Sequence, residues 1–257
     1  MENDADKKLP LTAHLEELKK RLIRVLIVMG LGLVVCYTFR DWSFKVITKP
    51  LLEVLPDAGS IVFTGLTEAF FVHLKIAFFA SLFLTSPYTL FQIWRFISPG
   101  LYKKERRYIV PFVTSASLLF IGGILFGYFV ALPPAFKFFV SFSTDVLKPM
   151  ISFREYLGLA LKFLLAFGIS FELPVFIYFL AKVGIVNATM LRRHRRYAIL
   201  LIFIAAALLT PSPDALSQII MAGPLMILYE ISIFLAKIAD RKKDKPTEPE
   251  EEETRGD

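Results

Sequence analysis

Residues 157–181 read LGLALKFLLAFGISFELPVFIYFLA, an apolar run that contains only two charged side chains, Lys162 and Glu172. A helix needs roughly 20 apolar residues to cross the hydrocarbon core of a bilayer, which is about 30 Å thick. This run is long enough to do so. We therefore predict that it crosses a membrane as a helix, with Glu172 inside the span.

Similar runs occur along the rest of the chain. The 257 residues are 55% hydrophobic and have a mean hydropathy of +0.57, more apolar surface than a soluble domain of this size can bury. At 1.5 Å per residue the fifth run covers only about 21 Å, and Pro224 and Glu230 interrupt the sixth, so the last two helices are expected to be short. We predict an all-α membrane protein with six transmembrane helices near residues 22–39, 69–93, 109–132, 157–181, 197–210 and 215–236.

The distribution of Lys and Arg predicts the orientation of these spans. Most of these residues lie before the first span, between spans two and three, between spans four and five, and after the sixth. Positive residues accumulate in cytoplasmic loops. Both termini are therefore predicted to be cytoplasmic, and the net charge of +7 reflects membrane orientation rather than binding to nucleic acid.

The N-terminal segment, residues 1–21, is predicted to be cytoplasmic. Its leucines recur at helical spacing, so it should contain an amphipathic helix that lies at the membrane interface and runs into the first span. The residues on that apolar face are Leu11, Leu15, Leu18 and Leu22.

Residues 22–236 form the transmembrane domain in this prediction, and residues 237–257 form a charged tail. The tail contains prolines and too few apolar residues to offset the entropy of ordering, so we expect it to be disordered. The two loops on the other side, residues 40–68 and 133–156, carry enough apolar residues to fold as short helices over that face.

The sequence contains no enzyme or metal motif. His14, His73 and His194 fall in different loops or spans, and the patterns H-E-x-x-H, G-x-S-x-G and the P-loop are missing. Cys36 is the single cysteine, so no disulfide can form within the chain. We expect no catalytic site, no metal and no cofactor.

Three carboxylates are candidates for function. Glu17 and Glu105 are predicted at the cytoplasmic edge, where each could bind a basic ligand or simply balance local charge, Glu17 by pairing with Arg21 one turn away. Glu172 lies inside a span. An ionisable group there is costly if it faces lipid, so Glu172 should face protein or water.

The turn between the last two spans is Pro-Ser-Pro-Asp at residues 211–214, which makes those helices antiparallel neighbours. Thr210 and Gln218 lie on either side of this turn. We regard them as a candidate polar patch within reach of lipid.

Four motifs resemble those of TatC, the signal-peptide receptor subunit of the twin-arginine protein translocase. The resemblance extends in order from about Leu9 to Ala239. Lys19 stands where the family usually has Arg, which keeps the charge but not the planar donor fork. The motifs are HLEELKKR at 14–21, WRFISPGLYKKERR at 94–107, FGISFELP at 167–174 and LTPSPD at 209–214.

This resemblance implies a receptor rather than an enzyme, with six helices in a cupped arrangement. It implies an oligomeric complex in the inner (cytoplasmic) membrane, with twin-arginine signal peptides and single-span TatA-type and TatB-type subunits as partners. It also implies site residues: for the signal peptide Glu17, Glu105, Phe96 and Arg106; on the concave face Glu172; for a partner helix Thr210 and Gln218; and for outer-loop structure or assembly Pro50 and Asp214.

Two other functions remain open from the residues alone. A proton-coupled transporter of small solutes would use Glu172 as its proton or ion site, although no internal repeat is visible. The other is that of a scaffold without a ligand of its own. Capture of an Arg-Arg peptide would favour the receptor, and solute uptake by this chain alone would favour the transporter.

Overall fold

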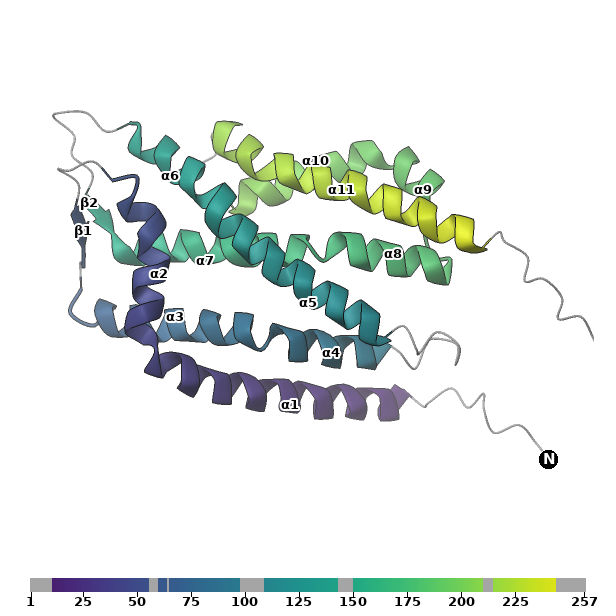
Figure 1. Cartoon of the computed structure of the whole chain (residues 1–257), viewed down its shortest axis with the longest axis horizontal. Helices are drawn as coiled ribbons and strands as arrows, with labels where there is room; N and C mark the ends of the chain where they lie inside the picture. Colours follow the sequence, from purple (N-terminus) through teal and green to yellow (C-terminus); the bar gives the residue numbers. More distant parts are fainter. Residues whose placement is uncertain are drawn as a thin grey trace, which may run out of the picture.

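The chain forms an elongated bundle of helices, seen in a computed structural model that describes residues 11–55, 60–63, 65–97, 109–142, 150–209 and 215–243 (Figure 1). The elements are α1 (Leu11–Thr38), α2 (Arg40–Leu52), β1 (Ser60–Val62), α3 (Glu68–Leu84), α4 (Ser86–Ile97), α5 (Ile109–Phe126), the π-helix η3 (Gly127–Ala131), α6 (Leu132–Val140), β2 (Met150–Ser152), α7 (Phe153–Ser170), α8 (Leu173–Val183), α9 (Ala188–Arg193), α10 (Arg195–Leu209) and α11 (Ala215–Lys243).

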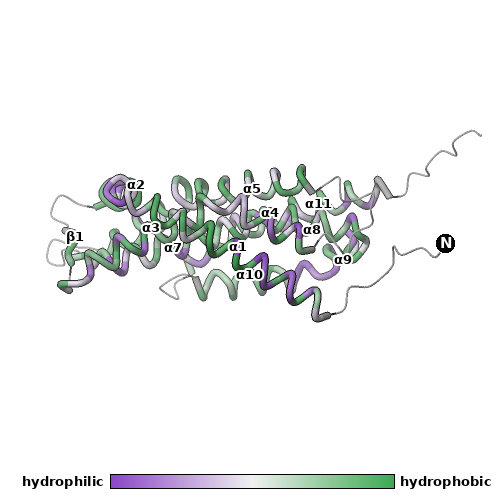
Figure 2. The backbone as a smooth tube through the Cα atoms, turned by 90° about the horizontal axis from the view of Figure 1, so that it is seen from below, coloured by the Kyte–Doolittle hydropathy of each residue, from purple (hydrophilic) through white to green (hydrophobic). Residues whose placement is uncertain are grey.

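The bundle has two distinct ends. The start of α1 and the end of α11 lie at one of them, called here the terminal end (Figure 1). The opposite end, called here the capped end, carries α2 and the two strands. Hydrophobic residues follow the helices along most of their length, and hydrophilic stretches occur toward the terminal end and in α2 (Figure 2). This distribution is that of a membrane protein.

Among the described residues, four helical stretches are long and apolar enough to cross a membrane: Thr12–Thr38, Val110–Val140, Phe153–Val183 and Gln218–Asp240. The pair Glu68–Leu84 and Ser86–Phe96 forms a fifth stretch that is bent by 53°. With α10, which has 15 residues and spans about 22 Å, they correspond to the six predicted runs. The fifth predicted helix is short, as expected.

The last helix is longer than predicted. α11 has 29 residues and extends past Ala236 to Lys243, so the first part of the predicted disordered tail is helical. The reason is tertiary, because Ala236 and Ala239 are buried and the Asp240 carboxylate accepts a hydrogen bond of 3.0 Å from the Ala188 backbone N–H. Residues 244–257 of the predicted tail lie outside the described residues.

The third helix also differs from its predicted end at Leu132. Helical structure continues through η3 and α6 to Val140, so the double proline lies within helix rather than at the start of a loop. Pro133 and Pro134 fall in the first turn of α6. Proline is tolerated there because the first N–H groups of a helix have no partner within that helix.

The capped end is built from the two loops predicted to cover it. α2 lies in the first loop and most of α6 in the second. In addition, β1 and β2 pair as a parallel ladder in which Ser60 is opposite Met150, a feature that an all-helical prediction missed. Three-residue strands carry too little alternation to be recognised in sequence.

Two tyrosines attach α2 to the rest of the bundle. The Tyr128 hydroxyl donates to the Val46 carbonyl at 2.6 Å, and the Tyr156 hydroxyl donates to the Ile47 carbonyl. Pro50 lies inside α2 and is buried beside Leu51. The helix therefore packs across the capped end, as Figure 1 shows.

Small residues let the long helices approach closely. A Cβ on Gly32 of α1 would lie 2.6 Å from Ser81 Oγ of α3, and the same hydroxyl donates a 2.6 Å hydrogen bond to the Met29 carbonyl. A Cβ on Gly123 of α5 would lie 2.5 Å from the Phe167 carbonyl oxygen of α7. Close backbone approach at small residues is a usual way for membrane helices to associate.

Gly123→Ala is expected to destabilise the bundle by about 1–3 kcal/mol, since the new methyl group meets backbone that cannot rotate away. Thermal unfolding of the purified protein in detergent measures the effect. Gly122→Ala is the matched control, because a Cβ on Gly122 meets nothing within 4 Å. Equal melting temperatures for the two variants would contradict the proposed close approach of α5 and α7.

Candidate functional site

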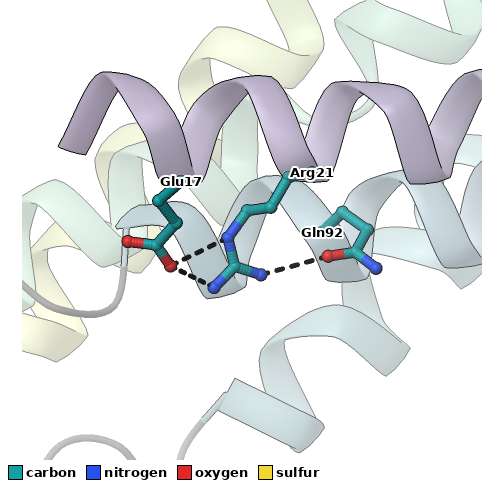
Figure 3. Close-up of polar contacts among 3 residues, drawn as sticks. All are labelled: Glu17, Arg21 and Gln92. Carbon is teal, nitrogen blue, oxygen red and sulfur yellow. Dashed lines mark hydrogen bonds and ion pairs between the residues drawn. The ribbon is translucent and has the colours of Figure 1, made fainter. Parts of the chain in front are cut away.

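A polar cluster joins α1 to α4 near the terminal end (Figure 3). Arg21 donates from Nε to Oε1 of Glu17 at 3.0 Å and contacts the same oxygen through Nη2. Its Nη1 donates to Oε1 of Gln92 at 3.0 Å, and the Gln92 amide donates to the Tyr88 hydroxyl at 2.7 Å. Glu17 is thus fixed in orientation by a guanidinium that α4 holds from its other side.

The burial of the cluster differs from one residue to the next. The Arg21 side chain is 12% exposed and that of Glu17 is 28% exposed, whereas Gln92 is buried. Oε2 of Glu17 accepts no hydrogen bond from the described residues and is turned away from Arg21 (Figure 3). The carboxylate therefore keeps one accessible oxygen for a further donor.

Phe96 lies beside this cluster. Its ring stacks on His14 with centroids 4.3 Å apart and planes at 13°. His14 is one helical turn before Glu17 on α1, and Phe96 is one turn after Gln92 on α4. The structure therefore brings Glu17 and Phe96 to the same part of the bundle, and their role in binding a peptide stays a prediction.

Two further predicted residues, Glu105 and Arg106, lie outside the described residues. They belong to segment 98–108, which joins Ile97, the last residue of α4, to Ile109, the first of α5. Their place near Glu17 stays a prediction.

Glu172 lies at the break between α7 and α8, within the long stretch Phe153–Val183. Pro174 follows in the first turn of α8, and the Glu172 carbonyl accepts from the Phe176 N–H at 2.9 Å. The side chain is half-buried, and its Oε1 is fully buried without a partner among the described residues. A buried acceptor without a partner is unusual, which makes Glu172 a candidate for a functional role.

The remaining predicted residues are spread over the bundle. Gln218 donates from its amide to the Phe203 carbonyl at 2.8 Å and so joins α11 to α10. Pro50 is at the capped end, in α2. Thr210 and Asp214 lie outside the described residues, so the polar patch and the outer-turn position stay predictions.

Sequence reasoning missed Gln92 and Tyr88, which orient Arg21. A glutamine inside the apolar run 69–93 was the available signal, because a buried amide needs partners. It also missed the ion pair between Arg195 and Glu230, 2.7 Å long, which links α10 to α11. Among the described residues, no group of three or more His, Cys, Asp or Glu side chains is arranged to hold a metal ion.

Comparisons with known proteins agree on one family. Residues 13–224 match the model of the family described as Sec-independent protein translocase protein (TatC). The chain is 46% identical to the Sec-independent protein translocase protein TatC of Desulforapulum autotrophicum, over 95% of this chain and 90% of the relative. It is 39% identical to the same protein of Aquifex aeolicus, over 91% of this chain and 98% of the relative.

A solved structure has the same fold. The crystal structure described as the twin arginine translocase receptor TatC matches this chain with a TM-score of 0.79 at 38% identity. The match covers 88% of this chain and 99% of the solved one.

Proposed function

The chain belongs to the TatC family of Sec-independent protein translocase proteins, and from this premise we propose that it is the receptor subunit that binds the Arg-Arg signal peptides of folded proteins. It acts without catalysis of its own. It also recruits TatA-type and TatB-type single-span subunits, and it sits in the inner membrane with both termini in the cytoplasm.

The geometry of Glu17 is the observation that carries this proposal. Its carboxylate is held by Arg21, is partly exposed, and keeps Oε2 accessible near the terminal end. A guanidinium presents a planar fork of donors that a carboxylate accepts more strongly than a neutral acceptor does. One arginine of the signal peptide can therefore bind Glu17 from the side opposite Arg21.

A second carboxylate is needed for the second arginine, and Glu105 is the residue that the family motif supplies. It stands between basic residues, Lys104 and Arg106, in segment 98–108. Those neighbours repel a single stray cation. A peptide that offers two guanidinium groups to two carboxylates overcomes this repulsion, so the basic surroundings contribute to specificity.

The apolar part of the signal peptide has a surface to follow. Leu22 and Leu26, one turn apart on α1, are both exposed and lead from Glu17 along the helix. We propose that the peptide continues along the bundle toward Glu172, whose buried Oε1 has no partner among the described residues.

Partner recruitment is proposed for the α10 side. Leu200, Leu201, Ile204 and Leu208 are exposed along this short helix, and Gln218 lies close by on α11. A single-span helix packing there would bury these four apolar side chains. A hydrogen bond to the polar patch would contribute on the order of 1 kcal/mol.

Replacing both arginines of a signal peptide by lysine is expected to weaken binding to the full chain by about tenfold or more, equivalent to about 1.4 kcal/mol. Lysine keeps the charge but cannot form the two parallel bonds of a guanidinium. Fluorescence anisotropy of a labelled peptide, with the protein in lipid nanodiscs, measures the change.

Equal affinity for the Arg-Arg and Lys-Lys peptides would contradict the receptor proposal. A peptide with the same composition but separated arginines serves as the control for overall charge. Proton-coupled solute uptake into liposomes that contain this chain alone would favour the transporter instead.

A further inference from the structure

Three cationic side chains gather between α3 and α7 toward the capped end. Arg154 and Lys162 lie two turns apart on α7, with Gly158 midway between them. A Cβ on Gly158 would lie 3.7 Å from Nζ of Lys75, which reaches across from α3. The charges of Lys162 and Arg154 both act on Lys75, and all three side chains are exposed. We refer to these three residues as the cation cluster.

Two members of the cation cluster, Lys75 and Lys162, lie at membrane depth, whereas Arg154 lies at the start of its span. Lys162 is nine residues into the span that begins at Phe153, about 13 Å along the helix axis. Lys75 is seven residues into α3, about 10 Å along its axis. Charged side chains at such depth are expensive and are normally paired with one another or with a ligand.

Ion pairs of five described carboxylates all join residues outside the cation cluster: those of Glu16, Glu17, Asp41, Glu53 and Glu230. Glu68 is nearby but is already engaged: it accepts from the Gly65 N–H at 3.1 Å, from the Arg154 backbone N–H at 3.1 Å and from the Ser152 hydroxyl at 3.4 Å. Glu155 lines a different cavity, beside Leu51 and Tyr156. The surface between α3 and α7 therefore carries net positive charge.

A cavity of about 760 Å³ opens beside Lys75 and Arg154, and Lys162 lies outside its lining. Lys75, Arg154 and Glu68 are its charged lining residues, and most of the other walls are apolar, among them Leu33 of α1, Phe71 and Phe78 of α3, and Leu157 of α7. Its volume is that of a small-molecule site. The lining thus combines cations with an apolar wall against which a hydrocarbon chain can pack.

We propose that this cavity binds an anionic phospholipid of the leaflet at the capped end. The phosphate lies among Lys75, Arg154 and Lys162, and an acyl chain packs against Phe71 and Phe78. Phosphate oxygens accept charge-assisted hydrogen bonds from all three cations, and basic pockets between membrane helices are suited to anionic headgroups.

Snorkelling, in which each lysine extends along its own helix to the membrane interface, does not explain the position of Lys75. Such a side chain runs toward water near its own backbone, whereas Lys75 crosses to Gly158 and meets the cations of α7. A carboxylate on a partner helix is a poorer fit to the cavity. A helix with its side chains is about 10–12 Å across and needs a long groove rather than a cavity of this size.

Native mass spectrometry of the full chain, purified in detergent and titrated with phosphatidylglycerol, tests the proposal. The double variant Lys75→Gln with Lys162→Gln is expected to bind phosphatidylglycerol about tenfold more weakly than the unaltered chain. Lys75→Arg with Lys162→Arg is expected to retain binding, which separates loss of charge from loss of fold. Phosphatidylcholine and glycerol phosphate, added separately, are expected to compete poorly.

The matched control is Lys45→Gln with Lys137→Gln, which removes the same charge from exposed positions on α2 and α6. Equal loss of phosphatidylglycerol in the control and test variants would overturn the proposal, because binding would then follow total charge. Full competition by glycerol phosphate would overturn it in favour of a free phosphate site. If the test variant binds lipid normally but loses a co-purifying single-span subunit, the proposal is wrong. The cation cluster would then bind a carboxylate of that subunit.

Discussion

Glu17→Gln combined with Glu105→Gln is expected to abolish site-specific cross-linking of an Arg-Arg signal peptide to this chain. The amide keeps the volume of each side chain but removes the negative charge that a guanidinium needs. Of the single variants, Glu105→Gln should have the larger effect. Arg21 already occupies Oε1 of Glu17, so Glu17 has only part of its accepting capacity left for a ligand.

Glu16→Gln provides the matched control. Glu16 is adjacent in sequence but forms an exposed pair of 2.7 Å with Lys20, and the side chain is 64% exposed. Its replacement should leave cross-linking unchanged. Because Glu17→Gln deprives the poorly exposed Arg21 of its carboxylate, the melting temperature of each variant is measured as well. Normal cross-linking in a correctly folded double variant would rule out the two-carboxylate site.

Glu172→Ala is expected to stop the export of folded cargo, whereas Glu172→Asp should retain a substantial part of it. Oε1 of Glu172 is buried without a partner among the described residues, so we expect a group that arrives during transport to bind it once the bundle rearranges. Aspartate keeps the carboxylate group on a side chain that is one methylene shorter. Export of a folded reporter in cells that lack their own copy measures the effect.

Signal-peptide cross-linking at Glu17 should survive in Glu172→Ala, because the two carboxylates lie at different depths of the bundle. Glu155→Ala, an exposed carboxylate near the start of α7, serves as the control for loss of charge from the same helix. Full export by Glu172→Ala would reduce Glu172 to a structural residue. If the isolated chain takes up a solute and Glu172→Ala eliminates this uptake, the result would support the transporter.

Much of the fold was predictable because membrane spans are read from consecutive residues. The composition and length of a run such as 157–181 are enough to predict a membrane-spanning helix. The short fifth span was predicted in the same way, from the number of consecutive apolar residues. The position of Glu172 within a span was predictable on the same ground. The pairing of Glu17 with Arg21 was one of two readings, since residues four apart share a helix face.

The tertiary structure decided what depends on residues far apart in the chain. Gln92 orients Arg21 from α4, Asp240 extends α11 by binding the Ala188 N–H, and Lys75 reaches across from α3 to Gly158 of α7. Hydropathy and helical spacing describe only neighbours along one helix. The sequence by itself determined six apolar runs and the two carboxylates inside them, Glu172 and Glu230. Helix packing decided which polar groups meet, because polar groups at membrane depth must find their partners across helices.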